Sequence, residues 1–411
     1  MIFGAFAIFF TGYPHVWSIY QPYVMEQAGW SQGQASMCFY LALSTFVFGN
    51  ILGGRMQNRF KEKTIVWIGG GIFAAGILAS AFLIVPTPLP MYLSYGVMQG
   101  FGQGMIYTVI LATVQRWFPD RTGFASGVVV TANGLCGFFL APLSRKLLEA
   151  EGVQKTFLII GAAIAVSWIL CGIFFQAPDK SLVNAGGSAA KSGTSEMKQY
   201  TSGEMMRTRN FYLLLATMFF GLISYFMVSP VSQTYQIDLG IPSAVAVSAV
   251  MLGSIVNAGA RLVLPTLADK VGRIVCIKGV LIVAVIAMGV LAVSRSLAVT
   301  VAVVLMYGCY GGIMGSFPSL TSSIFGMKHT GENYGFVMFG IVFATFGAPA
   351  ISGLVSSKGY EMNVVFGIGA VFAVIALVCL TLLGQNLVKE HAEKSAGVKN
   401  DTAQVSKPQA E

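Results

Sequence analysis

Long apolar runs, separated by short charged loops, recur along the whole chain and constrain its fold more than any other feature. A helix needs about 20 apolar residues to cross a bilayer. Hydrophobic residues make up 55% of the chain and charged residues only 10%, against about 25% charged in a typical soluble domain. We therefore predict an all-α polytopic membrane protein. A β-barrel is excluded, because its strands alternate in polarity and give no long apolar run.

The runs predict twelve transmembrane helices in two six-helix bundles. The expected spans are 2–24, 33–56, 64–85, 90–115, 123–148, 155–176, 210–236, 242–268, 275–294, 297–324, 333–356 and 363–384. A segment rich in Gly, Ser, Ala and Lys divides them six and six, a composition typical of a flexible linker. The predicted parts are an N-terminal bundle, a cytoplasmic linker, a C-terminal bundle and a disordered cytoplasmic tail, at 1–177, 178–206, 207–385 and 386–411. Thr201 and Glu204 have the spacing of a capping box.

Basic residues are distributed unevenly between the two sides of this predicted topology. With the N-terminus inside, cytoplasmic segments hold 19 Lys and Arg residues and outer segments hold 5. The positive-inside rule then places both termini in the cytoplasm. The net charge of +9 lies in these short loops, which argues against nucleic acid as a partner. We expect a multi-pass monomer in the cell membrane, with the lipid bilayer around it.

The two halves of the chain form an internal sequence repeat at an offset of about 208 residues. An Ala-Pro pair at 141–142 corresponds to one at 348–349. Such a repeat favours a transporter whose site lies between the halves, near the midplane. Small residues four positions apart let helices approach closely. The pairs with this spacing are Gly100/Gly104, which correspond to Gly308/Gly312 in the repeat, and Gly311/Gly315.

One charge, Arg261, interrupts the apolar run of the eighth span. It lies eight residues before Asp269, which places it roughly 12 Å inside the membrane at the rise of an α-helix. No carboxylate lies inside any apolar run to neutralise it. Charges inside membranes mark substrate pathways by default, so we interpret Arg261 as the binding group for an anionic substrate. The alternative is a structural arginine that donates to helix-end carbonyls.

Other classes of function find little support in the sequence. All six cysteines fall in apolar segments, without CxxC or metal-ligand spacing. No nucleotide-binding loop of the G-x-x-x-x-G-K-[ST] type occurs. A membrane-embedded enzyme would need a nucleophile and base or metal ligands in the spans, where we find one histidine and no acid. We predict no catalytic residue, no metal site and no cofactor.

The segment 264-LPTLADKVGR-273 resembles the signature that follows the eighth span in the major facilitator superfamily, with Pro265 in place of a glycine. The resemblance implies the major facilitator fold and a cytoplasmic gating network. The first-half copy of the signature is degraded, with Asn58 where an Asp is usual. The gating residues implied are Asp269, Arg273 and Arg59.

Further stretches resemble the oxalate:formate antiporter family within that superfamily. They are 115-QRWFPDRTGFASG-127, 202-SGEMMRTRNFY-212, 317-FPSLTSSIFG-326, 333-NYGF-336 and 17-WSIY-20. The oxalate exchanger of that family pairs the span-eight arginine with a lysine in span eleven, and the lysine position falls at Ile341 here. Arg261 is kept and the lysine is absent. One fixed cation suits a monocarboxylate, because a second carboxylate left without a partner in a low-dielectric path would cost several kcal/mol.

The same resemblance implies further pocket residues. Tyr107, Tyr310 and Asn133 align with positions that line the family's pocket, and so do Met314 and Met338. Tyrosine hydroxyls can donate to a carboxylate while the rings exclude water. The alternative for each of the three polar residues is packing or a helix–helix hydrogen bond.

His15 is the one histidine in a predicted span, and it aligns with an aromatic pore residue of the oxalate exchanger. It is interpreted either as a titratable ligand or proton carrier, or as a neutral histidine bonded to a carbonyl freed by Pro14. The sequence leaves both interpretations open.

These observations predict a secondary active transporter of small carboxylates that works by alternating access. A monocarboxylate such as lactate, pyruvate or formate is the expected substrate, carried by proton symport or anion exchange. The alternatives are an oxalate:formate-type exchanger and a carboxylate sensor that does not transport.

Overall fold

The computed structural model describes residues 2–175 and 198–405, and within these ranges it contains helices and no strands. The first half contains α1 (Ile2–Phe9), η1 (Phe10–Val16), α2 (Trp17–Ala28), α3 (Gln32–Met56), α4 (Glu62–Ser80), α5 (Leu89–Met91), η2 (Tyr92–Gln99), α6 (Gly100–Trp117), η3 (Pro119–Arg121) and α7 (Thr122–Phe174). The second half contains α9 (Ser202–Met205), α10 (Arg209–Val228), η4 (Ser229–Val231), α11 (Ser232–Asp238), α12 (Ser243–Val271), α13 (Arg273–Val293), α14 (Ala298–Phe325), α15 (Thr330–Val337), α16 (Phe339–Ser357) and α17 (Met362–Val405).

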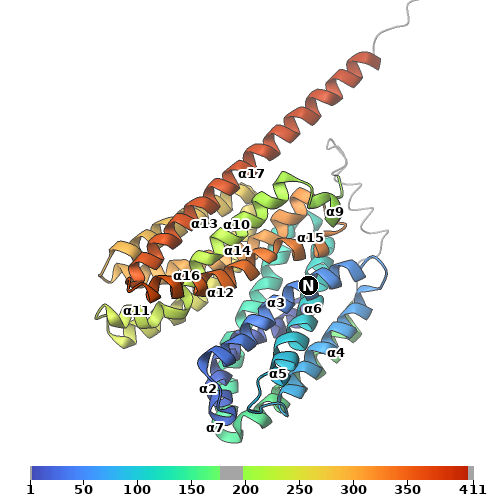
Figure 1. The fold of residues 1–411 in the computed structure, drawn as a ribbon. Coiled ribbons are helices and arrows are strands. Elements are labelled where there is room, and N and C mark those ends of the chain that lie inside the picture. The colour runs from blue at the N-terminus through green and yellow to red at the C-terminus, as the bar shows by residue number, and fades with distance from the viewer. Residues whose placement is uncertain (1, 176–197, 406–411) are drawn as a thin grey trace, which may run out of the picture.

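The two halves form two bundles that lie against each other, one coloured blue to teal and the other green to red (Figure 1). Helix α7 of the first bundle packs on α12 and α14 of the second. Helix α15 of the second bundle packs on α3 and α6 of the first. The interface between the bundles is therefore built from these two crossings, α7 on α12 and α15 on α3.

Helices cover most of each of the twelve predicted spans. Ten segments of the described residues are long and apolar enough to cross a membrane. One of them, Pro119–Phe174, contains two predicted spans, because Gly152 at φ 76° interrupts the helix between them. The first predicted span is divided among α1, η1 and α2 and so is not one of the ten. Pro14 lies in η1 and Pro230 in η4, where a residue without an N–H loosens the regular helix.

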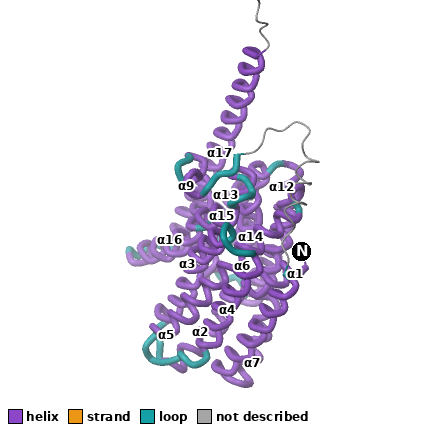
Figure 2. Tube along the Cα trace, turned by 90° about the vertical axis from the view of Figure 1, so that its right-hand side faces the viewer, coloured by secondary structure: helices purple, strands orange, loops and turns teal. Residues whose placement is uncertain are grey.

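The C-terminal segment differs from the expectation. We predicted a disordered tail over 386–411, but α17 continues to Val405 and projects away from the bundle (Figures 1 and 2). Its sequence after residue 385 contains Lys, Glu, Ala and Gln and no proline before residue 405, so good helix formers extend the last span. Residues 406–411 lie outside the described residues.

Most of the predicted linker, 178–197, also lies outside the described residues. The described end of this segment contains the capping box expected from the sequence. The Thr201 side chain accepts from the Glu204 N–H at 3.4 Å, and the Glu204 carboxylate accepts from the Thr201 N–H at 2.8 Å. Both bonds satisfy N–H groups that the start of α9 would otherwise leave without partners.

Glycines bring the helices of each bundle close together, as predicted for two of the three pairs. On α6, a Cβ at Gly104 would lie 2.0 Å from a backbone oxygen of α3. On α14, a Cβ at Gly311 would lie 2.2 Å from a backbone oxygen of α12. Only glycine permits such an approach. Gly308 and Gly312 instead face side chains of Val256 and Leu264.

Candidate functional site

Helix α12 carries Arg261 on the face that turns toward the protein interior. Its buried residues recur at steps of three or four positions with one step of five, the spacing of one helix face. They are Ala246, Ala249, Gly253, Ala258, Arg261, Pro265 and Ala268. The opposite face exposes large apolar side chains such as Met251 and Val263, at 64% and 60%. Arg261 is only 3% exposed, so the eighth span directs its single internal charge away from the lipid-facing surface.

The partners of Arg261 are neutral oxygens and one aromatic ring. Its Nε donates to Asn257 Oδ1 at 3.2 Å, and Nη1 donates to Asn133 Oδ1 at 3.0 Å and to the Val130 carbonyl at 3.3 Å. The guanidinium carbon lies 5.4 Å from the centre of the Tyr310 ring. Among the described residues Arg261 forms no ion pair. These three bonds use three of the five N–H donors of a guanidinium, so two can serve an anion.

A cavity of about 40 Å³ lies beside the guanidinium, between the two bundles. A volume of this size holds a few water molecules or one small organic anion. Its lining comes from both halves and consists of Leu43, Phe46, Gln103, Tyr107, Asn133, Phe226, Arg261, Tyr310, Met314 and Ile341. Among the described residues of this lining Arg261 alone is charged, and the others have apolar, aromatic or amide side chains.

The structure brings most of the sequence-predicted site residues to this one cavity. Arg261, Tyr107, Tyr310, Asn133 and Ile341 all line it, from five different helices. Met314 lines it as well, whereas Met338 is fully buried elsewhere and is not part of the lining. His15 belongs to η1, but its side chain lies outside the described residues, so its role stays a prediction.

Sequence reasoning missed several residues that shape the cavity. Gln103 lines it and donates to the Thr11 carbonyl on η1. Asn257, one turn before Arg261, holds the Nε of that arginine. A side-chain amide within an apolar run indicates a polar contact inside the protein. Gln103 and Asn257 could both have been found by this criterion. Tyr225 stacks on Tyr310 with centroids 4.2 Å apart and fixes that ring against the guanidinium.

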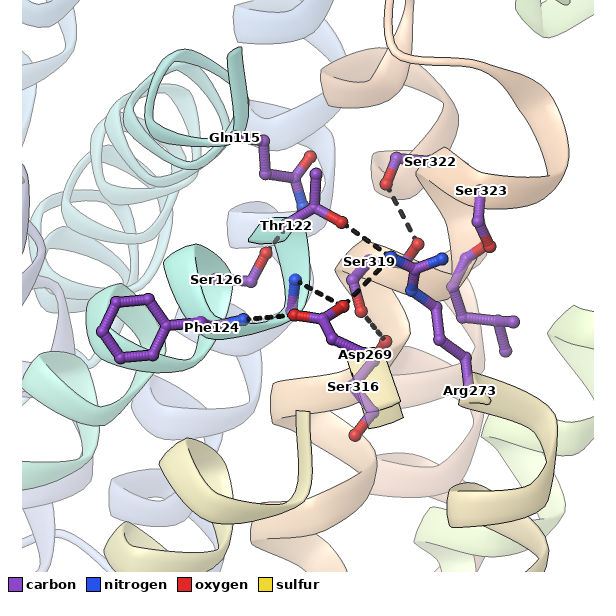
Figure 3. Close-up of polar contacts among 12 residues, drawn as sticks. Gln115, Thr122, Phe124, Ser126, Asp269, Arg273, Ser316, Ser319, Ser322 and Ser323 are labelled. Carbon is purple, nitrogen blue, oxygen red and sulfur yellow. Dashed lines mark hydrogen bonds and ion pairs between the residues drawn. The ribbon is translucent and has the colours of Figure 1, made fainter. Parts of the chain in front are cut away.

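Near the end of the same helix, Asp269 of α12 forms hydrogen bonds with the start of α7 (Figure 3). Its carboxylate accepts from the N–H groups of Gly123 at 3.2 Å and Phe124 at 3.0 Å, and from Arg273 at 3.1 Å. Arg273 also donates to Thr122 Oγ1 at 2.9 Å. The first N–H groups of a helix lack internal partners and carry its positive dipole end, so a carboxylate is stabilised there.

Arg59, the third expected gating residue, is exposed and forms no salt bridge among the described residues. Helix α3 ends at Met56, so Arg59 lies beyond the face that meets the other bundle. Arg55, one turn earlier, forms the contact instead, with its Nε 2.6 Å from Glu332 Oε1 of α15. This second tie between the halves was not predicted.

The residues that the structure describes contain no group of three or more His, Cys, Asp or Glu side chains that could hold a metal ion. The residues that line the cavity can recognise an anion. A guanidinium can bind a carboxylate through two N–H groups, and the tyrosine and amide side chains around it can donate further hydrogen bonds.

A family model described as Major Facilitator Superfamily matches residues 1–349 of this chain. The oxalate:formate antiporter of Oxalobacter formigenes is 26% identical over 377 residues, which cover 91% of this chain and 88% of that protein. An uncharacterized MFS-type transporter of Escherichia coli K12, YhjX, is 28% identical over 81% of each chain. Human monocarboxylate transporter 11 is 28% identical over 56% of this chain and 47% of its own length.

Solved structures of the same architecture match nearly the whole chain. The MFS transporter FucP, in an outward conformation, superposes with a TM-score of 0.71 over 93% of this chain and 98% of its own, at 13% identity. The proton:xylose symporter XylE superposes with a TM-score of 0.68 over 92% and 93%, at 14% identity. At these identities the similarity establishes the shared twelve-helix fold, which agrees with the fold predicted from the sequence.

Proposed function

We propose that this chain, which belongs to the Major Facilitator Superfamily, is a secondary transporter of small carboxylates whose preferred substrate is a monocarboxylate such as formate, lactate or pyruvate. The observation that carries the proposal is Arg261. It is a charge 3% exposed, bonded only to neutral groups, beside a cavity between the two bundles. A buried cation without a counter-ion costs several kcal/mol, and an anion entering the cavity would remove that cost.

The cation count of the cavity supports a monoanion over a dianion. Arg261 is the one charged residue among the described members of the lining, which also include Ile341. The resemblance to the exchanger family implies that Ile341 stands where that family has its second cation. Oxalate would bring a second carboxylate to a wall formed by Met314 and Ile341, which cannot donate hydrogen bonds. The 26% identical relative is named an oxalate:formate antiporter, and formate carries the single charge that this cavity can neutralise.

The proposed topology places both termini in the cytoplasm of a cell-membrane protein. The Asp269–α7 contact and the Arg55–Glu332 pair then lie on the cytoplasmic side. Both are closed in this structure, so the cavity would be sealed from the cytoplasm. Proton coupling through His15 remains part of the hypothesis, and an exchanger of oxalate type and a non-transporting sensor are the competing functions.

Uptake of labelled formate and lactate into proteoliposomes tests the proposal. Arg261→Gln should lower uptake by at least about 30-fold, because loss of one partner from a buried charge pair costs about 2–5 kcal/mol. Arg145→Gln is the matched control, since the Arg145 side chain is 73% exposed and pairs with Glu149 one turn away on the same helix. Undiminished uptake by Arg261→Gln would refute the role of the arginine. Specific binding without uptake by the unmodified protein would favour the sensor.

The charge argument also predicts a change of specificity. Ile341→Lys would add a second cation to the cavity wall and should shift competition for uptake toward dicarboxylates such as oxalate. Ile341→Met, which changes the shape but adds no charge, is the control. If oxalate competes equally weakly against both variants, features of the cavity other than its charge exclude the dianion.

A further inference from the structure

Two of the hydrogen bonds of Arg261 cross the boundary between the bundles. The arginine belongs to α12 in the second bundle, whereas Asn133 and Val130 belong to α7 in the first. The Asn133 amide oxygen and the Val130 carbonyl both accept from Nη1, at 3.0 and 3.3 Å. Gly134 lies against the side chain of Arg261 and gives it room, since a Cβ there would be 3.3 Å from Cδ. The first bundle therefore presents two oxygens to the charge of the second.

The orientation of the Asn133 amide is determined by its other neighbour. Thr11 donates its hydroxyl hydrogen to the Ile8 carbonyl at 2.5 Å. A hydroxyl has one hydrogen, so Thr11 Oγ1 can only accept from Asn133. The Asn133 Nδ2 accordingly donates to it at 3.0 Å, and Oδ1 points to the guanidinium. The hydrogen-bond network thus presents an acceptor to Arg261, which is also what a carboxylate would present.

We propose that Asn133, together with the Val130 carbonyl, takes the place of the substrate carboxylate when no substrate is bound. The unloaded protein can then convert between its inward-facing and outward-facing states. This inference rests on the proposed transport function and specifies its mode. An alternating-access carrier rocks around a site near the midplane, and the empty site must become enclosed during that movement. A guanidinium enclosed without acceptors would oppose the movement, whereas one bonded to Asn133 would not.

The strength of the two acceptors explains how substrate would still bind. A hydrogen bond between a guanidinium and a carboxylate is about twice as strong as one with a neutral acceptor. A carboxylate that binds through Nη1 and Nη2 together therefore displaces the amide oxygen of Asn133 from Nη1, while the Nδ2 of this residue stays bonded to Thr11. The protein should then carry out net transport as well as exchange. A carrier without such an acceptor would return only when loaded, which is obligatory exchange.

The test compares net efflux with exchange of labelled formate in proteoliposomes, with the membrane potential clamped by potassium and valinomycin. Unmodified protein should show net efflux into formate-free buffer. Asn133→Leu should lower net efflux about tenfold more than exchange, the rate ratio expected when a hydrogen bond to a buried charge is lost. Asn133→Ser, which keeps an oxygen acceptor, should retain more net efflux than the leucine variant.

Asn257→Leu is the matched control. Asn257 also accepts from Arg261, at 3.2 Å, but from the same helix, so it moves with the arginine. Its loss should lower net efflux and exchange by the same factor. Exchange without net efflux in the unmodified protein would overturn the inference and leave the transport function intact. Equal loss of both fluxes in both Asn133 variants would also overturn it. Absence of all flux from the unmodified protein would instead refute the transport function.

Discussion

The two crossings between the bundles use glycine in the same way and charge in different ways. At the α7–α12 crossing, a Cβ at Gly123 would lie 2.3 Å from the Pro265 carbonyl. At the α15–α3 crossing, a Cβ at Gly54 would lie 2.2 Å from the Glu332 backbone nitrogen. Both contacts therefore bring backbone against backbone. Close approach of the two backbones is thus common to both crossings.

The polar ties at the two crossings are built differently. On one side, the carboxylate of Asp269 lies within α12 and accepts from the start of the facing helix and from Arg273. On the other, the carboxylate of Glu332 lies at the start of α15 and pairs with Arg55, whose side chain is 57% exposed. The first tie satisfies N–H groups at the start of α7 that have no partner within their own helix, whereas the second includes Arg55, whose side chain is exposed.

The charge of the proposed substrate site lies at only one of these crossings. A Cβ at Gly127 would lie 2.9 Å from the Arg261 backbone oxygen, so α7 packs directly on the helix turn that carries the charge. The α7–α12 crossing thus holds both the arginine and the Asp269 tie, about two helical turns apart. We infer that this crossing couples substrate binding to closure, and that the α15–α3 crossing serves mainly as a clamp.

The largest expected effect comes from filling the close approach at both crossings. Gly123→Val and Gly54→Val each insert a side chain where backbone atoms lie within 2.3 Å of the new Cβ. Overpacking of this kind costs about 1–3 kcal/mol or more, so each variant should lower formate uptake by about 10- to 100-fold. Initial uptake rates in proteoliposomes, with equal reconstituted protein, provide the measurement.

Each of these variants has a control on its own helix. A Cβ at Gly137 on α7 or at Gly33 on α3 meets no atom within 4 Å. Gly137→Val and Gly33→Val should therefore transport at close to the normal rate. If they are as defective as the crossing variants, the loss reflects helix propensity rather than contact between the bundles.

Removal of the two carboxylates should have unequal effects. Asp269→Ala leaves two helix-start N–H groups and Arg273 without this acceptor, at about 1–3 kcal/mol for a buried donor. Glu332→Ala leaves Arg55, which is exposed and can bind water, so the loss is about 0–1 kcal/mol. Uptake should fall about tenfold or more in the first variant and less than about fivefold in the second. Equal losses would contradict the difference we infer between the crossings.

The central site could be predicted because a single charge stands out in an apolar run. The interior position of Arg261 could be predicted from the sequence and from the cost of burying a charge. The role expected for Asp269 came from the resemblance to a family signature. The Arg55–Glu332 tie could not be found in this way. It depends on where α3 ends, and Arg59, four residues later, has the same charge but lies outside the helix. The boundaries of a helix are harder to predict from sequence than its existence.

The interior hydrogen bonds were also beyond the sequence. Asn133 was recognised as a pocket residue, but its partner Thr11 is 122 positions away, and no periodicity connects them. The prediction for the segment after residue 385 differs from the extent of α17 for a simpler reason. We judged 386–411 by its polarity, and a polar sequence of good helix formers continues a helix that is already nucleated.

The smallest expected effect concerns α9, which lies beside the α15–α3 crossing and not beside the α7–α12 crossing. This short helix docks beside α15, where Asn333 accepts from Ser202 at 2.9 Å and donates to the Tyr200 carbonyl at 3.0 Å. The backbone N–H and hydroxyl of Thr201, and then Lys198, lower the pKa of Glu204 in the capping box. A lowered pKa in the folded state means that the stabilisation is present above the unfolded value, about 4.3 for glutamate. It is lost as the pH falls through the folded value.

Glu204→Ala should therefore speed amide hydrogen exchange at Tyr200, whose N–H donates to the Phe325 carbonyl at 2.9 Å. The difference from the unmodified protein should be clear at neutral pH and should close as the pH falls below the lowered pKa of Glu204, after correction for intrinsic exchange rates. Glu26→Ala, at an exposed position of α2, is the control. The N–H groups of Gly123 and Phe124 should be unaffected, because Asp269 holds them at the other crossing. Faster exchange there as well would show that the two crossings open together, and the clamp would then be part of the coupling that we assign to α7 and α12.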